Sequence, residues 1–359
     1  MATVDHLYLH VPFCAHRCGY CDFVTVTGRE PLHGRYVDAL LAELDRERPR
    51  PRTIFVGGGT PSLLADDLLA RLLRGLPAAA EMTVECNPET ITESKARVLV
   101  EGGVTRVSLG AQSFRGHLLE VLERRADPAT VRRAVGILRA AGVTSLNLDL
   151  MFGVPGESGA DLDRDLRDLI ALAPDHVSTY ELEAKPRTRF TRRHGAELGR
   201  QAERLEYQYE RVVELMRGAG YRWYETANFC LPGHECAHNL GYWLGHDYLG
   251  LGVGAVSTHG LRRWRVRPGL AGYLEAVEAG RRPPQDDEPL TVGERATERL
   301  MLGLRLDRPL ALGDLRELVD ARAAERLVSA GALELDGDRV RLTDRGRFIA
   351  DDVLAGLLR

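Results

Sequence analysis

The sequence predicts an α/β protein whose N-terminal half is an open or partial barrel of six parallel β/α units. A C-terminal α+β extension and a small closing unit follow it. Short β-rich runs alternate with amphipathic stretches through the first 180 residues. Parallel strands need long crossover connections, so this alternation predicts a parallel sheet. Six units fall short of the eight in a closed TIM barrel, so an open or partial TIM-like barrel is expected.

The expected strands are short runs rich in β-branched and apolar residues: His6–Val11, Arg52–Val56, Met82–Cys86, Thr105–Leu109, Val143–Leu150 and His176–Tyr180. The amphipathic stretches predict helices at Tyr36–Glu47, Ala65–Leu73, Glu93–Glu101, Ala129–Ala141 and Leu162–Leu172. In such folds the functional site lies at the C-terminal strand ends. The residues at those ends are Cys14–Cys21, Gly57–Thr60, Glu85, Gln112 and Asp149.

Three units are predicted along the chain. Residues 1–195 form the barrel, and residues 196–284 form an extension with a long charged helix near Glu197–Gly218. Residues 285–359 form a small winged-helix-like unit, in which Asp336-Gly337 predicts a hairpin between Ala332–Leu335 and Arg339–Leu342. That unit carries 16 acidic and 12 basic residues, so its charge does not favour binding to DNA.

Composition narrows the class of protein. The 359 residues carry a formal net charge of −4 and are 44% hydrophobic and 28% charged, which is typical of a folded globular protein. The basic residues are scattered among acids, so nucleic acid is not an expected partner. With neither a signal peptide nor an apolar run of roughly 18 residues, we expect a cytoplasmic protein without direct membrane insertion.

The cysteines indicate a metal or redox centre. Three of the six lie in one short loop with the pattern Cys14-x3-Cys18-x2-Cys21, which does not suit a disulfide framework in a chain of this length. Three soft thiolates match iron-sulfur coordination and leave a four-iron cluster one ligand short. Zinc is the alternative, with His10 or His16 as its fourth ligand.

The segment His-Val-Pro-Phe-Cys-Ala-His-Arg-Cys-Gly-Tyr-Cys resembles the signature of the radical S-adenosylmethionine (SAM) superfamily, with Tyr20 before the third cysteine. The resemblance implies a 4Fe-4S cluster on the three cysteines, with SAM chelating the unique iron. It also implies an electron donor, because one electron from the cluster cleaves SAM to a 5′-deoxyadenosyl radical. A cluster with a purely structural role is the less favoured alternative.

Further motifs resemble the segments that hold SAM in relatives of oxygen-independent coproporphyrinogen oxidase. They are Gly-Gly-Gly-Thr-Pro, Glu-Cys-Asn-Pro, Leu-Gly-Ala-Gln-Ser-Phe, a downstream Arg, and Asn-Leu-Asp-Leu-Met-Phe-Gly-Val-Pro-Gly. The SAM-binding residues that this resemblance implies are Tyr8, Tyr20, Gly58, Gly59, Thr60, Glu85, Gln112, Arg124 and Asp149. Acids and amides suit the ribose hydroxyls and amino group, and an Arg suits the carboxylate. Glycines in the turn would let backbone amides approach the ligand.

A second motif, His238-Asn239-x-x-Tyr242-Trp243, resembles the His-Asn-x-x-Tyr-Trp motif of the HemW heme chaperones. A His can supply an axial ligand to heme iron, and Tyr and Trp offer flat surfaces to a porphyrin. A buried His with aromatic neighbours is the structural alternative. A second metal site, formed by Cys230, Cys236, His234 and His238, is a weaker one.

The resemblance implies heme binding and delivery to respiratory heme-containing proteins. Two alternatives stay open: oxidative decarboxylation of coproporphyrinogen III, and radical chemistry on another tetrapyrrole. The oxidases carry a further Cys where this chain has Phe23, and they have a longer segment before the loop Cys14–Cys21, here called the cluster loop. We therefore expect a heme chaperone. The sequence assigns no catalytic residue and leaves the oligomeric state open.

Overall fold

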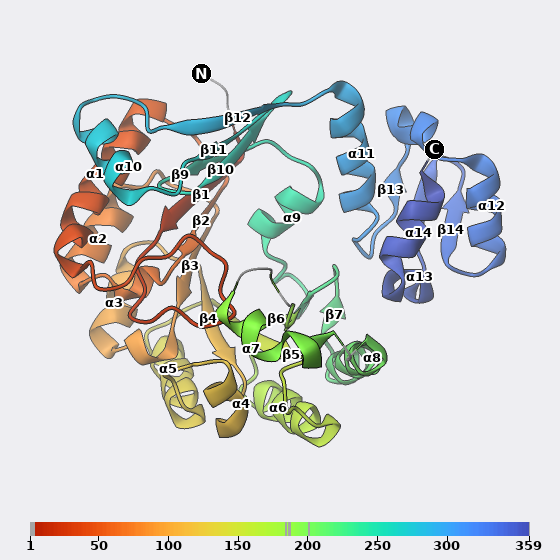
Figure 1. Cartoon of the computed structure of the whole chain (residues 1–359), viewed down its shortest axis with the longest axis horizontal. Coiled ribbons are helices and arrows are strands. Elements are labelled where there is room, and N and C mark those ends of the chain that lie inside the picture. Colours follow the sequence, from red (N-terminus) through yellow and green to blue (C-terminus); the bar gives the residue numbers. More distant parts are fainter. Residues whose placement is uncertain (1–3, 184, 186–187, 200–201, 359) are drawn as a thin grey trace.

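A large mixed sheet organises the molecule (Figure 1). The computed structural model describes residues 4–183, 185, 188–199 and 202–358. In this part of the chain twelve strands pair in the order β12-β11-β10-β9-β1-β2-β3-β4-β5-β6-β8-β7. The central strands run parallel in chain order and are β1 (His6–Val11), β2 (Thr53–Gly58), β3 (Glu81–Cys86), β4 (Arg106–Gln112), β5 (Ser145–Phe152) and β6 (His176–Glu181).

Helices cover the outer side of the parallel strands (Figure 1). They are α1 (His33–Glu47), α2 (Asp66–Gly75), α3 (Glu93–Glu101), α4 (Gly116–Val121), α5 (Pro128–Ala140) and α6 (Gly159–Ala171), with short 3-10 turns at Glu30–Leu32, Pro61–Leu63 and Pro88–Thr90. All six strands and five helices that the sequence predicts in this half form, with ends that differ by at most three residues. The short α4 was not predicted.

Burial of apolar side chains explains why these segments form the core. Leu7, Leu9 and Val11 of β1 are fully buried, and the apolar faces of α1 and α2 pack against the same cluster. In β4 and β5, buried apolar residues such as Leu109 and Leu148 alternate with polar ones such as Asn147. The parallel sheet and its outer helices therefore share one hydrophobic core.

Residues beyond 188 extend the same sheet at both edges. The first segments are the helices α7 (Arg189–Leu198) and α8 (Ala202–Gly218) and the strands β7 (Arg222–Trp223) and β8 (Asn228–Cys230); β8 pairs antiparallel with β6. The expected helix Glu197–Gly218 includes residues 200–201, which lie outside the described residues. What is described is two helices, because α7 ends at Leu198 and α8 begins at Ala202.

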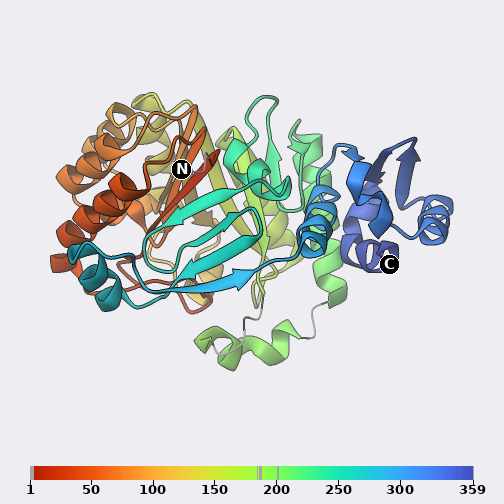
Figure 2. The same cartoon turned by 90° about the horizontal axis from the view of Figure 1, so that it is seen from above.

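The other edge grows from β1 (Figure 2). Strand β9 pairs parallel with β1, and the antiparallel strands β10 to β12 follow it. The elements of this segment are α9 (Ala237–Trp243), β9 (Tyr248–Leu251), β10 (Val256–His259), β11 (Arg262–Val266), α10 (Leu270–Glu278) and β12 (Gln285–Pro289). The large sheet thus continues to Pro289.

The C-terminal unit has its own small antiparallel sheet and its own apolar cluster (Figure 1). Its elements are α11 (Val292–Gly303), β13 (Leu310–Ala311), a 3-10 helix (Gly313–Leu318), α12 (Ala321–Ser329), β14 (Leu333–Asp336), β15 (Arg339–Leu342), α13 (Asp344–Phe348) and α14 (Ala350–Leu357). The predicted hairpin is present, and Gly337 at its turn has a φ of +59°.

Arg347 joins this unit to the large sheet. It is buried, donates to the Trp223 carbonyl at 2.9 Å and stacks over the Trp223 ring. No helix in the described residues is long and apolar enough to cross a membrane.

Candidate functional site

The predicted site residues converge on one cavity of about 540 Å³ at the C-terminal ends of the parallel strands. The cluster loop, the glycine turn and the start of α9 all line it, together with Glu85, Gln112, Arg124 and Asp149. Trp243 is the predicted residue outside this lining, and its buried indole Nε1 has no hydrogen-bond partner among the described residues. The remaining predicted residues therefore share one site.

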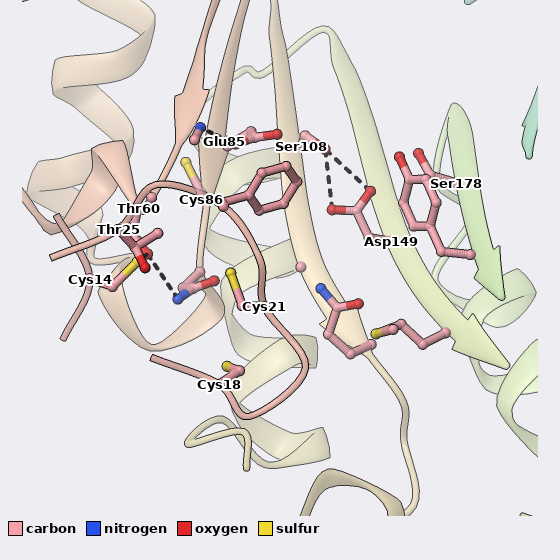
Figure 3. A pocket seen from close by; sticks show the side chains of 18 of the residues that line it. Cys14, Cys18, Cys21, Thr25, Thr60, Glu85, Cys86, Ser108, Asp149 and Ser178 are labelled. Atoms are coloured by element: carbon pink, nitrogen blue, oxygen red, sulfur yellow. Dashed lines mark hydrogen bonds between the residues drawn. The ribbon is translucent and has the colours of Figure 1, made fainter. Parts of the chain in front are cut away.

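The cluster loop lies at one side of this cavity (Figure 3). The Cys14 N–H donates to the Val26 carbonyl at 3.0 Å, and the Val26 N–H donates to Pro12 at 2.8 Å, so the loop closes on itself. Thr60 Oγ1 donates to Cys14 Sγ over 3.6 Å. Burial raises the pKa of Cys14 to about 11, so this thiol is neutral when nothing is bound to it.

The donor set fits an iron-sulfur cluster better than zinc. His10 is committed elsewhere: its Nε2 donates to the Val24 carbonyl at 2.8 Å and its Nδ1 lies 3.1 Å from the Tyr8 hydroxyl. Among the described residues, no three His, Cys, Asp or Glu side chains converge on a position for a single metal ion. Three thiols of one loop that face an open cavity instead suit a larger inorganic group, with one position left for a ligand.

The glycine turn after β2 is shaped by close packing. A Cβ on Gly58 would lie 2.3 Å from the His10 ring, and one on Gly59 would lie 2.6 Å from the backbone of Pro12. The amides of Gly58, Gly59 and Thr60 donate to the Glu85 carboxylate, Val11 and Phe13 at 2.8, 2.8 and 2.7 Å. In this structure the protein itself occupies these three amides, so a ligand in the cavity would meet the turn through its close approach and not through free N–H groups.

A bulge at the end of β4 aims Gln112 at the cavity. The register between β4 and β5 shifts between Gly110 and Gln112, and Gln112 has a φ of +66°, which is rare for a side chain of its kind. Arg124 lies beside it and donates to Asn87 Oδ1 at 3.0 Å and to the Gly110 carbonyl at 2.9 Å. Arg124 Nε is buried without a hydrogen-bond partner among the described residues, so it is one donor available to an anionic group.

Two carboxyl groups line the opposite side of the cavity (Figure 3). Burial raises the pKa of Glu85 to about 7, and the nearby Asp149 acts in the same direction. Burial also raises the pKa of Asp149 to about 6, against the effect of its hydrogen bonds. Asn147 Nδ2 donates to Asp149 at 2.6 Å, and Ser108 Oγ lies 3.4 Å from both carboxylate oxygens.

Sequence reasoning missed a polar network that runs from Asp149 to the α9 motif. Because Asn147 Nδ2 donates to Asp149, its Oδ1 accepts from His176 Nδ1 at 2.7 Å. Burial lowers the pKa of His176 well below its usual value, so its Nε2 accepts from the Tyr224 hydroxyl at 2.8 Å. Asn239 Nδ2 then donates to Tyr224 at 3.3 Å. The predicted SAM and heme residues are therefore linked.

The α9 motif forms a second wall of the cavity. His238 and Tyr242 are four residues apart on one helix, so they share a face, and His238 Nε2 lies 3.0 Å from the Tyr242 hydroxyl. His238 Nδ1 lies 2.8 Å from Thr53 Oγ1. His238 is 1% exposed, and burial lowers its pKa to about 3, so the ring is neutral. Phe55 packs between the rings of His238 and Tyr8.

Two family models match parts of this chain. The family model of the radical SAM superfamily matches residues 8–169, and that of the HemN C-terminal domain matches residues 290–349. Among solved structures, the coproporphyrinogen III oxidase HemN of Escherichia coli, a radical SAM enzyme, superposes with a TM-score of 0.86. That match covers 99% of this chain and 90% of the oxidase at 22% sequence identity, so it shows the fold.

Curated relatives match over nearly the full length. The heme chaperone HemW of Mycobacterium tuberculosis is 39% identical, with 98% of this chain and 94% of the relative covered. HemW of Escherichia coli is 34% identical, with 97% and 96% covered. HemW of Bacillus subtilis is 30% identical, with 98% of each chain covered.

The fold, the cluster loop and the matched family model define a radical SAM protein with a mixed α/β sheet and a small C-terminal antiparallel sheet. Within that class, the full-length relatives show to which family the chain belongs. The chain belongs to the HemW heme chaperone family.

Proposed function

We propose that this protein binds heme as cargo in the described cavity and passes it to heme-containing acceptor proteins, with respiratory proteins as the expected recipients. The observation that carries the proposal is the position of α9, which brings His238, Asn239 and Tyr242 into the cavity that the cluster loop lines. The full-length similarity to HemW heme chaperones supports it. Trp243 lies outside the cavity lining, so we expect it to support α9 by packing and not to contact heme.

We further propose that Cys14, Cys18 and Cys21 hold a 4Fe-4S cluster and that SAM binds beside it. When bound, the cluster and SAM supply one-electron chemistry, for which an external electron donor is required. Half-buried Arg124 suits the SAM carboxylate, while Glu85 and Asp149 suit its cationic and hydroxyl groups. The remaining proposed SAM-binding residues are Tyr8, Tyr20, Gly58, Gly59, Thr60 and Gln112, all in the same lining.

The three-unit division is also proposed. Residues 1–195 would form the partial (β/α)6 barrel, residues 196–284 the extension that carries the heme motif, and residues 285–359 a winged-helix-like unit. A separate apolar cluster between Leu300 and Leu357 supports the last unit. Strand β12 ties the start of that unit to the large sheet.

The deciding experiment reconstitutes the full chain anaerobically and divides it into two assays. One follows heme binding by spectral titration, and the other follows decarboxylation of coproporphyrinogen III with SAM and a reductant. Stoichiometric heme binding without decarboxylation supports the chaperone. Turnover to protoporphyrinogen IX would instead support an oxidase, which the shared fold with HemN keeps as the second candidate. Phe23, 64% exposed at the cavity, marks the position where oxidases carry a further Cys.

Replacing His238 by Ala tests whether the α9 side of the cavity binds heme. The substitution removes the partner of Thr53 and Tyr242 and opens a space in α9, so we expect heme to bind at least about tenfold more weakly, or roughly 1.4 kcal/mol. The brown absorbance of the cluster should persist. His259, exposed at the end of β10, provides the matched His→Ala control. Unchanged heme affinity in the His238 variant would return His238 to a packing role.

Replacing Cys18 by Ala tests the cluster. With one of three thiolates removed, anaerobic reconstitution should yield little iron and no brown absorbance. Cys230 is buried away from the loop, so Cys230→Ala is the matched control and should retain both. Full iron content in the Cys18 variant would refute the cluster assignment.

A further inference from the structure

A chain of hydrogen bonds leads from the protein surface to the cavity through His246, His6, Thr53, His238 and Tyr242. His246 Nδ1 lies 3.0 Å from His6 Nε2, and His6 Nδ1 lies 2.8 Å from Thr53 Oγ1. Thr53 Oγ1 lies 2.8 Å from His238 Nδ1, and His238 Nε2 lies 3.0 Å from the Tyr242 hydroxyl. His246 is exposed, the next three residues are buried, and Tyr242 lines the cavity.

This arrangement leaves His238 poorly placed to meet a ligand directly. Its side chain is 1% exposed, and both ring nitrogens already have partners. Tyr242, whose hydroxyl is the partner of His238 Nε2, also lines the cavity and is the less buried of the two residues. Tyrosine is one of the side chains that proteins use to ligate heme iron.

We propose, on the basis of the heme binding proposed above, that Tyr242 Oη is the protein atom that coordinates ferric heme iron. His238 is then a positioning residue, which holds the phenol and takes its proton. The assignment reverses the simplest interpretation of the motif, in which the histidine is the ligand.

The coordination step balances without a further reactant. The phenol O–H bond breaks, an Fe–O bond forms and the iron stays ferric. The proton moves to His238 Nε2 while the Nδ1 proton of that ring passes to Thr53, and the same exchange continues through His6 to His246 and water. A neutral imidazole has one donor and one acceptor nitrogen, and a hydroxyl both donates and accepts, so every member can pass a proton on.

Packing holds the members in register. The Tyr242 ring lies edge-on to His238 at 5.0 Å and to Tyr248 at 4.7 Å between centroids. His6 approaches α9 closely because residue 241 is glycine: a Cβ there would lie 2.3 Å from His6 Nε2. The His6 and His246 rings are stacked at 5.3 Å. These contacts restrain Tyr242, His6 and His246, so the hydrogen-bonded residues keep their relative positions.

The test uses the full reconstituted protein and ferric heme, and records resonance Raman and absorption spectra of the complex. The wild type should show tyrosinate vibrations of a tyrosine-ligated ferric heme. Tyr242→Phe should lose them, whereas His238→Gln should keep them with affinity reduced several-fold. A histidine-ligated spectrum that survives Tyr242→Phe and disappears in His238→Gln would overturn the assignment and leave heme binding intact. Failure of the wild type to bind heme would overturn the proposed function itself, and this assignment with it.

The proton route has its own measurement. The rate of ferric heme ligation should be slower in D2O for the wild type, and Thr53→Val should ligate more slowly and lose that isotope effect. Thr53→Ser, which restores the hydroxyl, should recover both. The cluster absorbance of each variant reports that it has folded. An equal isotope effect in the wild type and Thr53→Val would refute the route through Thr53.

Discussion

At the scale of single residues, the two carboxyl groups that line the cavity, Glu85 and Asp149, determine how the cavity responds to pH. The pKa of Glu85 is raised to about 7 and that of Asp149 to about 6, first of all by burial. Above their ordinary values of 4.5 and 3.8, the unfolded chain binds fewer protons than the folded one. The stability that these two groups contribute is therefore lost as pH rises between about 4 and about 7.

The same shift predicts the pH dependence of SAM binding. Ionised Glu85 and Asp149 attract the cationic groups of SAM, so binding should release protons and tighten as pH rises from about 6 to about 8. Equilibrium dialysis of the reconstituted protein against labelled SAM measures this. The paired variant is Glu85→Gln, which should bind more weakly and with a flatter profile. An identical profile in the variant would contradict a role for Glu85.

Residue chemistry also shows what the sequence can and cannot predict. Glu85 and Asp149 stand out because each ends an expected strand, and strand ends of one parallel sheet meet. Asn147, His176 and Tyr224 did not stand out, since they are buried polar residues whose partners lie 29 and 48 positions away. One signal was available: Asn147 is two residues before Asp149, hence on the same face of β5.

At the scale of elements, alternation of strands and helices predicts the order of the parallel strands, because consecutive β/α units become neighbours. The edges of the sheet are different. Strands β7 and β8 are two and three residues long, and β9 pairs with β1 across more than 200 residues. Periodicity identifies a strand but carries no information about a distant partner.

The turn after β2 supports an element-level prediction. A Cβ added to Gly59 would lie within 2.7 Å of backbone atoms of Pro12 and Phe13, and backbone cannot rotate away as a side chain can. Gly59→Ala should therefore cost about 1–3 kcal/mol of stability and displace the cluster loop, with lower iron content after reconstitution. Gly136 in α5 has open space around it, so Gly136→Ala is the control and should be neutral or slightly stabilising. Thermal unfolding and iron analysis report both effects, and a Gly59 variant as stable as the control would contradict the clash.

At the scale of the whole molecule, the cavity depends on sequence far apart in the chain. The cluster loop follows β1, while the proposed heme wall comes from α9, which packs against β2 although some 180 residues separate the two in sequence. Both edges of the parallel sheet are completed by residues 222–289. The cavity therefore belongs to the large sheet as a unit, and the C-terminal unit keeps a separate apolar cluster.

Separate cores predict separable stability. Leu315 is fully buried in the C-terminal cluster, and Leu148 is fully buried in the large core on β5. Each Leu→Ala substitution should cost about 2–5 kcal/mol at its own site. Because β5 also carries Asp149, Leu148→Ala should reduce cluster retention and SAM binding together. Leu315→Ala should instead accelerate amide hydrogen exchange in residues 310–358 while the cluster absorbance stays at the wild-type level. If Leu315→Ala lost the cluster as readily as Leu148→Ala, the two cores would unfold as one, and the contact of Arg347 with Trp223 would be the connection to examine.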